Sequence, residues 1–279
     1  MSLMPLSRLR VAALIPFAAV LLGAAPPAHA DWEKIKLSGS LKVAVYEQFA
    51  PFSDHGAGID VDVAQALAKK LGLKLSLLPF PAGENLGDDL RNMVWKGHYL
   101  GYGPADVMLH VPVEPQLMNE NGQVTIFAPY HVETVRLVRS TRSIPAFDGI
   151  DALDGKTIGV EKVSISAMVL LGEGNGRFRD KVRIFDTAAE ALEQLKSGQL
   201  DAVLANRSEI EAVFRDDADF PLNQVAFQRL PRVGWAVGMA VRKDDQEMAK
   251  LLQAAINEMK TSGELKAIFA KYGVHEQAP

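Results

Sequence analysis

Residues that could carry out a reaction are few and widely separated in this chain of 279 residues. The chain has no cysteine and contains neither a Gly-x-Ser-x-Gly nor a His-Glu-x-x-His pattern. Glu114, His110 and His131 have the chemistry to move protons, and His55 could join the two histidines around a metal ion. Their long spacings match no known ligand signature. We therefore expect binding rather than catalysis, with no metal and no cofactor.

A second set of residues suits the binding of a small organic molecule by stacking and hydrogen bonds. These residues follow, or lie close to, segments that have the pattern of β-strands. In an open parallel sheet, ligands bind at the carboxyl ends of the strands. The predicted ligand-binding residues are Tyr46, Phe49, Phe52, His110, Pro112, Val113, Tyr130, Ser164, Ser166, Asn206 and Arg207.

The clearest structural element is the run from Gly58 to Leu71, in which apolar residues recur every fourth position. This spacing predicts an amphipathic helix. Asp60 and Asp62 place negative charge at its N-terminus, where the helix dipole favours it. Strand-like runs flank the helix at 41–45 and 73–77. The unit is therefore β-α-β, the repeating element of an open parallel sheet.

The rest of the chain continues this alternation, which predicts the α/β class. The predicted strands cover 105–111, 134–139, 158–160, 182–185, 201–205 and 237–243. The predicted helices cover 88–96, a segment from about 166, 188–196 and two segments at the C-terminal end.

Residues 1–30 have the features of a secretory signal peptide. Two arginines precede an apolar run from Val11 to Ala25, and Ala28-His29-Ala30 is a typical cleavage sequence. We predict cleavage after Ala30 and a periplasmic mature chain. A retained membrane anchor is disfavoured because the apolar run is short and contains Pro16. A cysteine-free exported chain must draw its stability from core burial.

The charge balance of the mature chain excludes one class of partner. The signal removes two arginines from 30 basic residues and none from 34 acidic residues, which leaves 28 against 34 and a net charge of −6. Binding of nucleic acid needs clustered Lys and Arg, so we expect no nucleic acid as a partner. The remaining length of about 249 residues (279 minus 30) suits two lobes of ordinary size.

The segment Gly58–Leu71, with the preceding Ala50-Pro51-Phe52, resembles the opening of bacterial extracellular solute-binding proteins of family 3. The turn and strand at 153–160 resemble those that open the second lobe in this family, and the likeness continues in order over the mature chain. It implies a two-lobed periplasmic binding protein of type 2. Each lobe would be a mainly parallel sheet flanked by helices, with residues 31–136 and 236–279 in lobe 1 and 137–235 in lobe 2.

The resemblance also implies how the protein works. Two strands crossing between the lobes would form a hinge, and a small-molecule ligand would be enclosed when the lobes close. The expected partners are that ligand and the inner-membrane permease of an ABC importer, and the expected state is a monomer.

Both charged contacts that relatives make to an α-amino acid are missing here. Relatives carry an Arg after the strand that matches 106–110, and it pairs with the α-carboxylate; the matching position here is Leu117 or Met118. The Asp that holds the α-ammonium in relatives corresponds to Asn206, and a polar turn of relatives corresponds to Val163–Ser166. A buried carboxylate without a cation costs several kcal/mol. We therefore expect a larger or flatter organic ligand, for which an anion is one option, rather than a standard α-amino acid.

Two further functions stay open. Some divergent relatives accompany periplasmic quinoprotein alcohol dehydrogenases of the methanol type, so an accessory role with such a dehydrogenase as partner is the second candidate. A cleft dehydratase is the third. The insertion His98–Pro104 is unusual for the family, and its aromatic residues and glycines suggest a partner contact. The alternative is a loop folded back onto its own lobe.

Overall fold

A computed structural model of the chain describes residues 29–228, 230 and 234–279. The predicted signal peptide falls almost wholly on residues 1–28, which lie outside the described residues. The described chain begins with helix α1 (His29–Ser38). None of its helices is both long enough and apolar enough to cross a membrane.

The strands form one continuous mixed sheet in the order β2-β1-β3-β9-β4-β7-β5-β6, with β8 paired beside β4. Their bounds are β1 (Ser40–Tyr46), β2 (Lys74–Phe80), β3 (Val107–Pro112), β4 (Val124–Arg139), β5 (Ile158–Glu161), β6 (Val182–Phe185), β7 (Ala202–Asn206), β8 (Leu222–Asn223) and β9 (Gly234–Arg242).

Helices cover both faces of this sheet. They are α2 (Ile59–Lys70), α3 (Leu86–Leu90), α4 (Pro115–Glu120), α5 (Ile165–Gly172), α6 (Ala188–Lys196), α7 (Arg207–Phe214), α8 (Gln246–Ser262) and α9 (Glu264–Lys271). Short 3₁₀ turns cover Ile150–Leu153, Glu173–Asn175 and Arg179–Lys181, and a π-helical turn covers Arg91–Trp95.

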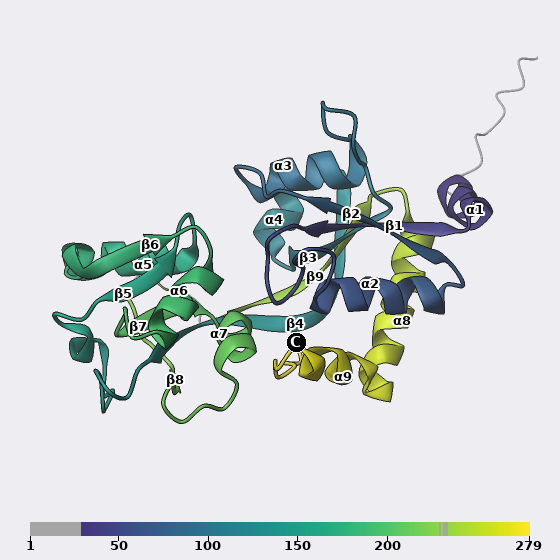
Figure 1. Ribbon diagram of the computed structural model, residues 1–279. Coiled ribbons are helices and arrows are strands. Elements are labelled where there is room, and N and C mark those ends of the chain that lie inside the picture. The colour runs from purple at the N-terminus through teal and green to yellow at the C-terminus, as the bar shows by residue number, and fades with distance from the viewer. Residues whose placement is uncertain (1–28, 229, 231–233) are drawn as a thin grey trace, which may run out of the picture.

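Two strands run from one half of the molecule to the other (Figure 1). β4 pairs antiparallel with β9 as far as Thr134 and then with β7 from Val135 onward. We call the half with β1–β3 lobe 1 and the half with β5–β7 lobe 2. The expected α/β class with two crossing strands is thus confirmed. We propose that the lobes divide where β4 changes partner, close to the predicted boundaries at 136 and 236.

Helix α2 shows how the sequence pattern becomes packing. Ile59, Val63 and Leu67 are fully buried in the core of lobe 1, and each such side chain stabilises the fold by about 1.5–3 kcal/mol. The helix must start at a glycine, because a Cβ on Gly58 would lie 2.2 Å from the carbonyl oxygen of Phe52. The predicted helix and its apolar stripe are confirmed.

Two predicted elements differ from the structure. The strand expected at 134–139 is the last part of β4, which begins ten residues earlier at Val124 and has an irregularity at Ala128, whose φ is 52°. The helix expected at 88–96 begins at Leu86, where the Asn85 side chain accepts a hydrogen bond from the Asp88 N–H at 3.0 Å.

Candidate functional site

A pocket of about 140 Å³ lies at the edge of lobe 2 that faces the crossing strands. It is formed by the carboxyl ends of β5 and β7, the N-termini of α5 and α6, and the start of β9. Its polar and aromatic lining consists of Glu161, Ser164, Ser166, Asn206, Glu209 and Trp235. We call it the lobe-2 pocket. Of the predicted ligand-binding residues, it brings together Ser164, Ser166 and Asn206.

Helix caps hold this lining in place. The Ser164 hydroxyl donates to the Glu161 carbonyl at 2.7 Å and accepts from the Ala167 N–H at 3.0 Å, which starts α5. Asn206 and Glu209 form a capping box at the start of α7, in which the Glu209 carboxylate accepts from the Asn206 N–H at 2.9 Å. The caps therefore place one carboxylate and two small polar groups at the mouth of the pocket.

The electrostatics of the lobe-2 pocket are those of crowded carboxyl groups. Burial raises the pKa of Glu209 well above its ordinary value, and the charges of Glu161 and Glu133 raise it further. Burial also raises the pKa of Glu161 and of Glu133. Among the described residues, the Glu133 Oε2 atom has no hydrogen-bond partner. A group of like charges held out of water favours a positively charged ligand group.

Trp235 gives the pocket its aromatic wall. It stands directly opposite Glu133 on the paired strands β9 and β4, and it packs against the cores of both lobes. An indole beside carboxylates suits an organic cation, which can stack on the ring while its charge faces the acids.

The lobe-1 side of the cleft carries a cluster of rings. The Phe49 ring lies 5.2 Å from Phe52, 4.8 Å from His110 and 6.0 Å from Tyr46, measured between centroids. Phe49 is half-buried, whereas Phe52 is fully buried. The prediction for Phe52 was therefore wrong in its exposure: its ring supports Phe49 from within the core and cannot reach a ligand.

Asp60 holds two other predicted residues away from the cleft. The Tyr130 hydroxyl donates to Asp60 Oδ1 at 2.7 Å and accepts from the His110 N–H at 3.1 Å, and the His110 Nδ1 lies 3.1 Å from Asp60 Oδ2. Tyr130 is fully buried, so its predicted role in ligand contact is wrong. His110 sits at a bulge in β3 with φ 59° and is only 8% exposed. Its imidazole is engaged by Asp60 and by the neighbouring rings.

The remaining predicted residues lie apart from the lobe-2 pocket. The Tyr46 hydroxyl donates to Asp89 at 3.0 Å, and Tyr46 lines a separate hollow of about 250 Å³ in lobe 1. Pro112 and Val113 are half-buried at the end of β3, where the Val113 N–H donates to the Ala236 carbonyl at 2.9 Å. Leu117 and Met118 pack against the lobe-1 core and supply no cation.

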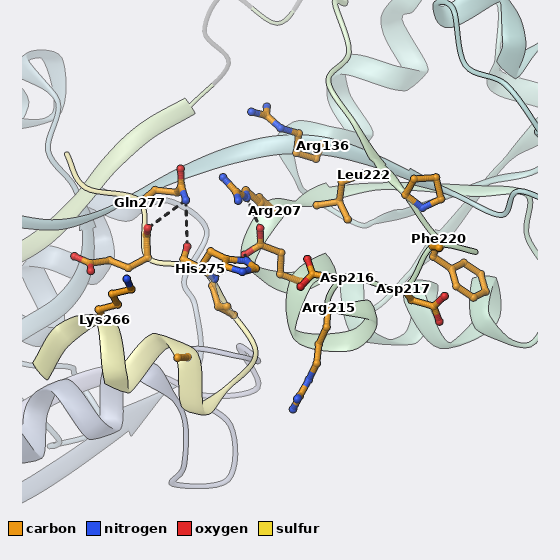
Figure 2. A pocket seen from close by; sticks show the side chains of 16 residues that line it. Arg136, Arg207, Arg215, Asp216, Asp217, Phe220, Leu222, Lys266, His275 and Gln277 are labelled. Atoms are coloured by element: carbon orange, nitrogen blue, oxygen red, sulfur yellow. Dashed lines mark hydrogen bonds and ion pairs between the residues drawn. The ribbon is translucent and has the colours of Figure 1, made fainter. Parts of the chain in front are cut away.

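Arg207 points into a different cavity, shown in Figure 2. Its guanidinium pairs with Glu211 and lines a groove of about 750 Å³ between α7 and the C-terminal segment. Arg207 therefore lies outside the lobe-2 pocket, because successive residues on a helix point about 100° apart, and its contact with a ligand stays a prediction. Asn206 faces the lobe-2 pocket, whereas the next residue, Arg207, faces the groove in Figure 2.

Three residues of the pocket were missed in the sequence. Glu209 follows Asn206 by three positions, the spacing of a capping box, which could have revealed it. Glu161 ends a predicted strand and could have been included on that ground. Trp235 comes from a distant part of the chain, and nothing local connects it to the other two.

The insertion His98–Pro104 forms a loop held by its own rings. The His98 ring stacks on Tyr102 with centroids 4.2 Å apart, and the His98 N–H donates to the Tyr102 carbonyl at 2.9 Å. At its tip Tyr99 and Leu100 are 88% and 68% exposed. A partner contact at this tip stays a prediction.

Comparison with known proteins agrees with this architecture. A family model described as bacterial extracellular solute-binding proteins, family 3, matches residues 120–275. The L-cystine-binding protein TcyJ of Escherichia coli (strain K12) is 26% identical over 248 residues, covering 86% of this chain and 84% of that protein. A probable histidine-binding protein of Neisseria gonorrhoeae is 25% identical over 248 residues, covering 84% and 83%. The structure of an ancestral cationic amino acid solute-binding protein (AncCDT-1) matches with a TM-score of 0.69 at 20% identity, covering 86% of this chain and 98% of that chain.

Proposed function

Because the chain belongs to the bacterial extracellular solute-binding proteins of family 3, we propose that it is the solute-binding component of an ABC importer. It would be cleaved after Ala30, reside in the periplasm and deliver its ligand to an inner-membrane permease. The relatives reported above are named as amino-acid-binding or solute-binding proteins. That agreement favours import over an accessory role with a quinoprotein dehydrogenase.

The proposed ligand is an organic cation that does not depend on a free α-carboxylate for binding. The observation that carries this proposal is the carboxyl group of Glu209, buried beside Glu161 and faced by the Trp235 indole. An amine or guanidinium group would relieve the repulsion between the two acids and stack on the indole. This replaces the option of an anionic ligand, which the same carboxyl groups would repel.

A dehydratase activity has weaker support. Burial lowers the pKa of His131 to about 3, so this imidazole stays neutral and is a poor proton carrier near neutral pH. His110 is engaged by Asp60. The two candidate acid–base histidines are therefore buried in the fold, His131 as a neutral ring and His110 in contact with Asp60.

Paired ligands that differ only in a carboxylate test the proposal. Calorimetric titration would compare arginine with agmatine, and lysine with cadaverine. We expect the decarboxylated member of each pair to bind at least as tightly, because positions 117 and 118 provide no partner for the carboxylate. Succinate and glutamate serve as anionic controls. Saturable binding of these anions, with no response to any amine, would overturn the proposed ligand class.

A further inference from the structure

The C-terminal segment leaves lobe 1 in a fixed direction. Helix α9 ends at Lys271. Gly273, just past the cap residue, has φ 76°, and the Gly273 N–H and Val274 N–H donate to the carbonyls of Ala270 and Phe269 at 3.0 and 3.2 Å. This is the Schellman arrangement, in which glycine takes the left-handed conformation and the next residue is apolar. Val274 is accordingly buried in the lobe-1 core. The residues that follow are directed toward lobe 2.

From there the segment crosses to α7 and to the hinge. The His275 N–H donates to the Glu211 carboxylate on α7 at 2.8 Å. Two residues later, the Gln277 N–H donates to the His131 Nδ1 at 3.2 Å, and the Gln277 carbonyl accepts from the Val132 N–H at 2.9 Å. The segment therefore bonds to lobe 2 through α7 and to the crossing strand β4.

His131 extends this connection to the first turn of α7. Its Nδ1 accepts the hydrogen bond of the Gln277 N–H, which assigns the hydrogen of the neutral ring to Nε2. The Nε2–H then donates to the Ser208 Oγ at 3.0 Å. The Ser208 N–H in turn donates to Glu133 Oε1 at 3.4 Å. These three side chains are each about 1% exposed, so water does not compete for their bonds.

The first turn of α7 thus serves two sites at once. Asn206 and Glu209 line the lobe-2 pocket, whereas Ser208 and Glu211 are held by the hinge and by the C-terminal segment. A helix moves as a rigid unit over one turn. Any displacement of α7 relative to lobe 1 therefore also displaces the two pocket residues.

The groove in Figure 2 shows what the segment spans. One wall belongs to lobe 2 and includes Arg136 and Arg207, and the other belongs to lobe 1 and includes Lys266 and Ala270. The walls enclose about 750 Å³ rather than packing on each other. His275 and Gln277 lie across this space in Figure 2.

We propose that the segment Val274–Gln277 is a strap that sets the angle between the lobes and positions α7. Gln277 and His131 are positioning residues, since they act on the pocket only through Ser208 and the helix. The proposal goes beyond the function proposed above, and its test needs no ligand. If the proposed ligand class proves wrong, the strap proposal is unaffected.

Interlobe distances measured by double electron–electron resonance test the strap. The cysteine-free chain accepts two spin labels at exposed helix positions, through Gln65→Cys in lobe 1 and Glu193→Cys in lobe 2. Deletion of residues 275–279 removes the strap bonds, and deletion of only the exposed residues 278–279 is the matched control. We expect a shifted mean and a broader distance distribution for the longer deletion, and the full-chain distribution for the control.

A point variant distinguishes the loss of the strap bonds from a general destabilisation caused by the deletion. Gln277→Pro removes the N–H that reaches His131 and keeps the chain length. We expect it to shift the distance distribution in the same direction as the longer deletion. It should also speed hydrogen exchange of the 207–214 amides, while exchange in α2 stays unchanged. If both variants fold and give the distance distribution of the full chain, the strap does not set the lobe angle.

Discussion

The carboxyl groups of Glu161, at the end of β5, and of Glu209, in the first turn of α7, line one pocket, and the charge of Glu161 raises the pKa of Glu209. The two residues are 48 positions apart in the chain. The Trp235 indole lines the same pocket. This pairing is the basis for the ligand proposed above, and it makes the role of each carboxylate separable by mutation.

Glu209→Gln should weaken binding of agmatine and stabilise the empty protein. Glutamine keeps the capping box, which accepts either residue, but removes a charge that burial disfavours. We expect the Kd to rise at least about tenfold, as for loss of a buried charged partner. We expect the free energy of unfolding at pH 7 to increase by on the order of 1 kcal/mol. Calorimetry and urea unfolding measure the two effects.

The control for this change is Glu190→Gln. Glu190 occupies the same position in α6 as Glu209 does in α7, but it is exposed. It should alter neither binding nor stability by a measurable amount. Unchanged agmatine affinity in Glu209→Gln would show that the buried acid does not contact the ligand.

Trp235→Leu should weaken binding of amines without unfolding the protein. Replacing the indole removes the stacking of a cation on the ring, which corresponds to a loss of about 3- to 30-fold in affinity. Trp95→Leu is the control, because Trp95 lies on the π-helical turn of lobe 1 and is 37% exposed. Equal affinities of the two variants in calorimetry would exclude Trp235 from the site.

Tyr130→Phe should affect stability rather than binding. The change leaves Asp60 without the 2.7 Å bond and His110 without an acceptor for its N–H, both in the buried core. We expect a loss of about 1–3 kcal/mol in the free energy of unfolding. Tyr272→Phe removes a similar bond from Asp62, whose side chain is 28% exposed, and should cost less. Weaker ligand binding by Tyr130→Phe at unchanged stability would instead show that Tyr130 contacts the ligand.

Acidification should destabilise the protein through His131. Its pKa is lowered from 6.5 to about 3 by burial first and then by nearby positive charge. Between these two pH values the unfolded chain binds a proton that the folded chain does not, so stability falls as pH falls. The limiting slope for one proton is about 1.4 kcal/mol per pH unit.

Urea unfolding of the parent protein and of His131→Gln between pH 7 and pH 4 isolates this contribution. The raised pKa values of Glu133 and Glu209 act in the opposite direction, since they lower stability as pH rises, but they are present in both proteins. We expect a shallower pH dependence for His131→Gln. The control His55→Gln changes an imidazole that is 84% exposed and should leave the slope intact. Parallel curves for His131→Gln and the parent would contradict the assignment.

Sequence patterns were sufficient for the scaffold because they report on local burial. The stripe of α2 and the apolar strands follow directly from the spacing of apolar residues. They also led to Ser164, Ser166 and Asn206, which line one pocket near the strand ends; their contact with a ligand stays a prediction.

The same patterns could not distinguish a residue facing the cleft from one facing a helix. Tyr130 and Phe52 have the composition of a ligand wall, but α2 and its Asp60 cover them. Arg207 lies outside the lobe-2 pocket because one step along a helix turns the side chain away from it. Trp235 required the pairing of β4 with β9, which is a long-range contact that no local spacing encodes.

The unbroken sheet has a mechanical consequence. A hinge made of loops would let the lobes swing freely, whereas here β4 runs without interruption from its ladder with β9 in lobe 1 to its ladder with β7 in lobe 2. Reorienting the lobes must therefore change the twist of β4 relative to the strands paired with it, and the hydrogen bonds between these strands oppose that change.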